Sequence, residues 1–143
     1  MSAGISISDY FDKDLVTEDI YGISRWGDGL ITVLENGHIG LCQPETPDSI
    51  PTDLTEIIKN LDQRGITAPV LLRVTNFLRS RIDQINISFN AAIDELAYKG
   101  KYRGVFPVKV NQQAPVVDRI VEFGRPYDFG LEVGSKAELL IAL

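Results

Sequence analysis

The stretch that decides the fold is YRGVFPVKVNQQ, Tyr102–Gln113. Its apolar run from Val105 to Val110 predicts a short strand, and a segment with helical spacing begins directly after it. Strand alternation would place Val105, Pro107 and Lys109 on one face of a sheet. A lysine at the C-terminal end of a strand that leads into a helix stands where βα barrels have their active sites. A partly desolvated amine at such a place suits Schiff-base formation with a carbonyl group.

Two interpretations of Lys109 stay open on spacing alone. Most lysines that end strands are solvated surface residues, which favours the interpretation without a function. Pro107 favours the functional one, because it lies inside an otherwise good strand and removes a hydrogen-bond donor from the ladder. Such breaks of local rules concentrate at functional or strained sites.

Composition and charge exclude several classes of protein. The chain has 143 residues, 44% of them hydrophobic and 24% charged, which predicts a globular domain. A net charge of −6 argues against a general nucleic-acid binder. Cys42 and His38 are the only residues of their types, so we expect neither an internal disulfide nor a zinc cluster. With no signal peptide and no apolar run long enough to span a bilayer, we expect a cytoplasmic protein without a membrane partner.

The first half of the chain contains a hairpin signal and a helix signal. Residues 1–20 form an N-terminal extension, in which Tyr10–Ile20 has helical spacing after the candidate cap Asp9. Two apolar runs, 30–34 and 38–42, flank Glu35-Asn36-Gly37, the strongest short hairpin signal. A proline-containing linker, 43–51, leads to a predicted helix with Asp53 and Glu56 at capping-box spacing and Gly65 after its end.

The second half of the chain alternates between strand and helix patterns. The expected strands are Pro69–Val74, Gly104–Val110 and Asp128–Val133. The expected helices are Ile82–Tyr98, with Ile85, Phe89, Ile93 and Leu96 inward, a second over 114–123 that ends at Gly124, and a third that Ser135 caps. Residues 75–81 are expected to form a loop. The order β-α-β-α-β-α predicts an α/β fold with parallel strands, and Leu143 falls within a helical pattern, so we expect a truncated barrel.

Four separate segments resemble one known family. FPVKVNQQ and FGLEVGSKAELL, with YGISRWGDGLITVLENGHIG and LLRVTNFLRSRI before them, resemble the biosynthetic arginine decarboxylases. These belong to the pyridoxal-phosphate decarboxylases with an alanine-racemase-like barrel. The resemblance implies that residues 52–143 are the first three βα units of a TIM-like, cofactor-binding barrel. It implies that residues 21–51 are a hairpin segment and linker of the accessory β domain.

The resemblance also implies roles for individual residues. Lys109 is similar to the lysine that binds pyridoxal phosphate as a Schiff base, and Glu132 to the acidic residue close to the cofactor and its lysine. A solvated strand-end glutamate is the alternative for Glu132. Asn111 would bind the cofactor, orient its neighbours or cap the next helix, and Ser135 would act as an N-cap or touch the cofactor. Arg73 is buried by pattern, so it would need an anionic partner, either Glu132 or a ligand.

The activity that the resemblance implies is decarboxylation of L-arginine to agmatine and CO2, a step toward polyamines such as spermidine. It implies a homo-oligomer with shared active sites, and magnesium besides pyridoxal phosphate, although the sequence contains no recognisable magnesium site. The phosphate site and the residues that select arginine are expected beyond Leu143, so this chain alone should be inactive. Two alternatives remain: a decarboxylase of another basic or diamino acid, and a truncated, non-catalytic remnant that binds a full-length subunit.

Overall fold

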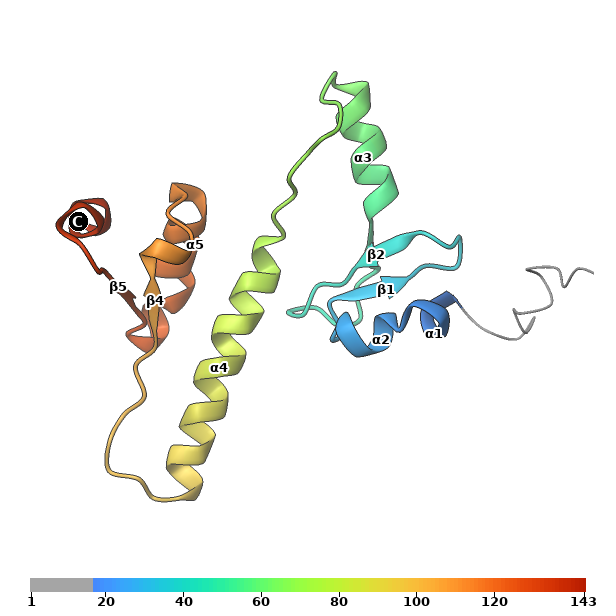
Figure 1. Ribbon diagram of the computed structural model, residues 1–143. Coiled ribbons are helices and arrows are strands. Elements are labelled where there is room, and N and C mark those ends of the chain that lie inside the picture. The colour runs from blue at the N-terminus through green and yellow to red at the C-terminus, as the bar shows by residue number, and fades with distance from the viewer. Residues whose placement is uncertain (1–16) are drawn as a thin grey trace, which may run out of the picture. The chain divides into compact units, whose positions relative to one another are not determined.

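The computed structural model describes residues 17–143 and shows two compact units, one reaching to Leu71 and one from Leu72 to Leu143 (Figure 1). The expected helix Tyr10–Ile20 lies mostly outside the described residues, as does its candidate cap Asp9. The assignment of residues 1–20, 21–51 and 52–143 to an extension, an accessory segment and a barrel stays a prediction.

The first unit contains a three-stranded antiparallel sheet, β1-β2-β3. Pairing of Val33 with Ile39 closes the hairpin around Asn36-Gly37, as the sequence predicts. The third strand was not expected, because a pairing of only two residues leaves no periodicity in the sequence. The elements of this unit are α1 (Thr17–Tyr21), α2 (Ile23–Trp26), β1 (Ile31–Val33), β2 (Ile39–Leu41), β3 (Thr52–Asp53) and α3 (Leu54–Gln63).

Helix α3 begins and ends at the predicted signals. The Asp53 carboxylate accepts hydrogen bonds from the backbone N–H groups of Thr55, at 2.8 Å, and Glu56, at 3.3 Å. These are donors that the first turn of a helix cannot pair internally. Gly65 follows the last turn with φ of +76°, a conformation that glycine adopts without steric cost. Both ends of α3 are therefore set by local sequence.

The same Asp53 side chain joins the hairpin turn to α3. Its Oδ2 lies 2.7 Å from His38 Nδ1 and accepts a hydrogen bond from Asn36 Nδ2 at 3.2 Å. Desolvation by burial raises the pKa of Asp53, but the hydrogen bonds from His38, Asn36 and the α3 backbone outweigh it and lower the pKa to about 2. His38 is therefore part of a structural contact.

The second unit is built on a two-stranded parallel sheet, β4-β5, as expected for a β-α-β segment. Short 3-10 helices follow β4, at Val108–Val110, and α5, at Arg125–Tyr127. The elements are α4 (Thr75–Glu95), β4 (Val105–Pro107), α5 (Ala114–Gly124), β5 (Gly130–Glu132) and α6 (Lys136–Ala142).

The core of this unit lies between α4, α5 and one face of the sheet (Figure 1). Ile82 of α4 packs with Ile120 and Phe123 of α5, and Phe106 and Leu131 cover them from the paired strands. Because side chains alternate along a strand, the residues on either side of Phe106 and Leu131 face away from this core. The face of the sheet that bears Pro107 and Glu132 is therefore turned away from the helices.

Two glycines make room for Phe129 in this core. A Cβ atom on Gly124 would lie 2.7 Å from the Phe129 Cβ, and one on Gly104 would overlap the Phe129 ring. The sequence predicted Gly124 as a helix terminator. Gly124 is the last residue of α5, so the predicted end of the helix is confirmed, while the left-handed conformation occurs later, at Asp128, with φ of +53°. Packing against Phe129 gives a further reason for a glycine at position 124.

Two sequence predictions about the start of this unit are wrong. Pro69–Val74 belongs to no strand, and Thr75–Arg81 is the first part of α4 instead of a loop. A strand needs a hydrogen-bonded neighbour, and among the described residues β4 pairs with β5 alone. The run FLRSRI contains neither glycine nor proline, and Leu78 and Ile82 recur at helical spacing, so the helix extends back to Thr75.

The inward face of α4 also differs from the prediction. Ile82 and Asn86 are buried, whereas Ile85, Phe89 and Leu96 are each at least 44% exposed. Because α4 has apolar residues on more than one side, its periodicity did not identify the side that packs against α5. The helix ends at Glu95, earlier than the predicted Tyr98.

Candidate functional site

Lys109 lies directly after β4, in the 3-10 helix Val108–Val110. The alternation of the strand ends at Pro107, so strand periodicity no longer determines the direction of the lysine. Val108 is fully buried and anchors this turn, while Lys109 is exposed. The amine is therefore at the carboxyl end of β4, as predicted, but on a turn instead of the strand itself.

The register of the sheet brings Glu132 to the same end. Glu132 pairs with Pro107, two residues before Lys109, and is half-buried. Helix α6, which follows β5, contacts the 3-10 helix that holds Lys109. The lysine and the carboxylate thus occupy neighbouring strand ends, which is the edge where α/β proteins place catalytic groups.

A second carboxylate, Glu138, holds the turn between β5 and α6. Ser135 is the N-cap of α6, since its Oγ accepts a hydrogen bond from the backbone N–H of Glu138 at 3.1 Å. In return, Glu138 Oε2 accepts one from the backbone N–H of Gly134 at 2.7 Å. This confirms Ser135 as a cap. Sequence analysis did not single out Glu138 as a residue of the site, although a serine followed three residues later by glutamate is a capping-box signal.

The loop after Lys109 contains a chain of polar contacts. Asn111 Oδ1 accepts a hydrogen bond from the backbone N–H of Gln113 at 3.1 Å, so Asn111 orders the loop and does not itself cap α5. The Gln113 side chain accepts a hydrogen bond from Nη2 of Arg73. Gln113 was not predicted as a site residue, because nothing in its local sequence indicates a partner 40 positions away.

Arg73 differs from its prediction. The expected buried arginine, paired with Glu132 or a ligand, is instead exposed, and the amide oxygen of Gln113 is its hydrogen-bond partner. The expected burial depended on a strand at Pro69–Val74, which the structure lacks. A neutral acceptor suffices because a solvated guanidinium needs no compensating charge.

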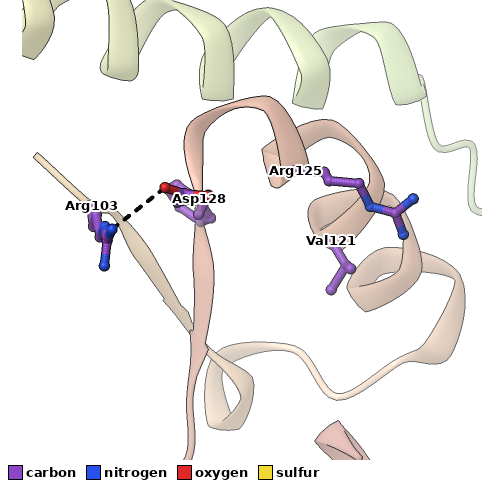
Figure 2. A pocket seen from close by; sticks show the side chains of 5 residues that line it. Arg103, Val121, Arg125 and Asp128 are labelled. Carbon is purple, nitrogen blue, oxygen red and sulfur yellow. Dashed lines mark ion pairs between the residues drawn. The ribbon is translucent and has the colours of Figure 1, made fainter.

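A cavity of about 410 Å³ lies at the opposite end of the sheet. Figure 2 shows that Arg103 faces Asp128 across its mouth, at 3.6 Å, while the guanidinium of Arg125 lies away from this pair. Arg103 precedes β4 and Asp128 precedes β5, so the cavity is at the amino ends of the strands. It is therefore separate from the edge that Lys109 and Glu132 share.

Residues 17–143 contain neither a candidate metal cluster nor a helix that could span a membrane. No three His, Cys, Asp or Glu side chains come close enough together there to hold a metal ion. None of the helices in that range has the length and apolar character needed to cross a bilayer.

Comparison with known proteins shows similar sequences and a similar solved structure. No protein-family model matches the chain. A biosynthetic arginine decarboxylase of Prochlorococcus marinus (strain MIT 9313) is 42% identical over all of this chain and 22% of its own length. One from Gloeobacter violaceus is 43% identical over 92% of this chain and 21% of its own length. The crystal structure of the biosynthetic arginine decarboxylase SpeA from Campylobacter jejuni matches 85% of the chain with a TM-score of 0.77 and 36% identity.

These matches confirm the resemblance noted in the sequence and support the α/β class. The chain spans only about a fifth of the length of the relatives that it matches. The chain is therefore similar in sequence and in fold to a part of the biosynthetic arginine decarboxylases.

Proposed function

We propose that the chain forms part of an enzyme that uses pyridoxal phosphate to decarboxylate L-arginine to agmatine and CO2. The observation that carries the proposal is the position of Lys109, exposed at the carboxyl end of β4, with Glu132 at the end of the neighbouring strand. The homology to arginine decarboxylases over 85% to 100% of the chain supports arginine as the substrate. We also propose that residues 52–143 form the first three βα units of a barrel.

The donor set at this edge fits pyridoxal phosphate. A primary amine is the group that attaches an aldehyde cofactor, and Lys109 presents its amine at an exposed turn. Pyridoxal phosphate, when bound, supplies the electron sink that decarboxylation needs. Of the described residues, Lys109 would hold the cofactor and Glu132 would lie beside it. Asn111 would order the loop, and Ser135 would keep the following turn in place.

Glu132 would act through its charge. In the proposed site, Glu132 would place a negative charge at the strand end next to the turn of Lys109 and orient the Lys109 nitrogen toward the reacting centre.

Further features rest on the homology alone. We expect the enzyme to be cytoplasmic, to feed polyamine synthesis, and to form a homo-oligomer with active sites between subunits. Magnesium is expected from the family and would bind outside the groups described above.

A second function is favoured by the exposed apolar side chains of the second unit. Val105 on β4 is 56% exposed and Leu140 on α6 is 76% exposed, which suits burial against further polypeptide. A non-catalytic chain that binds a full-length decarboxylase subunit would bury the same residues. The mass of the natural gene product separates the two, because a product several times larger than this chain supports the enzyme.

The assay that tests the proposal uses the complete gene product that contains this sequence. Loaded with pyridoxal phosphate, it should release CO2 from L-arginine faster than from ornithine, lysine or diaminopimelate. Preference for one of the other amino acids would replace arginine as the substrate but keep the chemistry. No release from any of them would contradict the proposed function.

A further inference from the structure

We propose that Arg73 is a positioning residue, which fixes the loop that follows Lys109 by holding Gln113. The inference rests on the proposed role of Lys109 in catalysis. It concerns a contact between the segment before α4 and the segment before α5. Arg73 comes two residues before Thr75, the first residue of α4, and Gln113 is the N-cap of α5.

The contact connects to Lys109 through consecutive hydrogen bonds. Nη2 of Arg73 donates to Oε1 of Gln113, and the backbone N–H of Gln113 donates to Oδ1 of Asn111 at 3.1 Å. Asn111 comes two residues after Lys109 and directly follows its 3-10 helix. Arg73 is thus linked, through the side chain and backbone of Gln113 and the side chain of Asn111, to the residue that follows the turn with Lys109.

Gln113 is a suitable point for such a link because it also organises α5. Its carbonyl oxygen accepts hydrogen bonds from the backbone N–H groups of Val116, at 2.8 Å, and Val117, at 3.1 Å. No side chain caps the first turn of α5. A displacement of Gln113 would therefore move both the start of α5 and the loop behind Lys109.

The loop needs an anchor because it is otherwise weakly held. Asn111 and Gln113 have extended backbone conformations, and residues 112–115 are exposed. Catalysis depends on placing reacting groups within fractions of an ångström, so loss of a remote tether lowers the rate without removing a contact to the substrate. Arg73 is suited to this role since its guanidinium presents several donors in a fixed plane.

Amide hydrogen exchange on the complete gene product tests the link without any activity. Arg73→Ala should speed exchange at the amides of residues 113, 116 and 117 by about threefold to tenfold, the range expected for one lost hydrogen bond. Gln113→Ala should do the same, and the double variant should add little, because both changes break one contact. Arg119→Ala, which removes an exposed arginine elsewhere on α5, is the matched control. Unchanged exchange in Arg73→Ala would overturn the proposal.

Kinetics of the complete enzyme test the consequence. Arg73→Ala should lower kcat by about threefold to tenfold with little change in the KM for arginine. Arg73→Lys should restore part of kcat, because lysine retains a donor. A raised KM with unchanged kcat would overturn the proposal and make Arg73 a substrate-binding residue. Should Lys109→Ala retain full activity, the proposed function would fail, whereas the exchange result would still decide the Arg73 contact.

Discussion

Glu132 on β5 pairs with Pro107 on β4 in the parallel ladder. Pro107 comes two residues before Lys109 in the sequence. The pairing brings Lys109 and Glu132, which are 23 positions apart, to the carboxyl edge of the sheet. It is possible because α5 connects β4 to β5 in a parallel arrangement. The lysine and the glutamate predicted from separate motifs thus lie at neighbouring strand ends.

The first prediction concerns Lys109. In the complete gene product, Lys109→Ala should abolish the bound-cofactor absorbance, borohydride trapping of pyridoxal phosphate, and decarboxylation, because the amine that attaches the cofactor is gone. Lys101→Ala, at the other end of β4, should leave all three intact. Trapping that continues unchanged at another lysine would contradict the assignment.

The second prediction concerns the charge of Glu132. Glu132→Gln keeps the shape of the side chain but removes the negative charge at the strand end beside the turn of Lys109. We expect kcat to fall by at least about tenfold, because the reacting centre would lose a charged neighbour. The exposed Glu122→Gln on α5 serves as the control. A wild-type rate in Glu132→Gln would make Glu132 a solvated strand-end residue.

The third prediction concerns the space around Phe129. Gly104→Ala should lower the free energy of unfolding by about 2 kcal/mol, because the new methyl group would overlap the Phe129 ring. Gly130→Ala is the control, since its Cβ would make an ordinary contact of 3.6 Å with Val105. Urea unfolding followed by far-UV circular dichroism measures the free energy of unfolding of both variants. Equal midpoints for the two variants would show that the core accommodates the methyl group freely.

The fourth prediction concerns the contribution of Asp53 to the stability of the folded chain at low pH. The pKa of Asp53 is lowered from 3.8 to about 2 in the folded chain, so the unfolded chain binds a proton first as the pH falls. The stability that Asp53 contributes is therefore fully present above about pH 4 and lost between pH 4 and pH 2. Helix content measured across this range should fall less steeply in Asp53→Asn, which starts from a lower stability. Asp62→Asn, elsewhere on α3, should lose helix content between pH 4 and pH 2 as steeply as the wild type. If Asp53→Asn also lost helix content as steeply as the wild type, the proposed role of the Asp53 carboxylate would be refuted.

Several elements could be predicted from short stretches of sequence because their causes are local. Asn36-Gly37 predicts the hairpin, Asp53 the start of α3 and Ser135 the start of α6, and the structure confirms each one. A turn or a cap depends on hydrogen bonds between residues two to four positions apart. The same holds for the placement of Lys109 at the end of an apolar strand.

By itself, the sequence determined the hairpin, the starts of α3 and α6, the parallel β4–α5–β5 order and the resemblance to arginine decarboxylases. The tertiary structure alone decided that Pro69–Val74 forms no strand, that Arg73 bonds to Gln113, and that Pro107 faces Glu132. Each of these depends on which distant segment lies alongside. A strand exists only with a hydrogen-bonded neighbour, and the partner of a polar side chain is set by the packing of separate elements, which local periodicity does not encode.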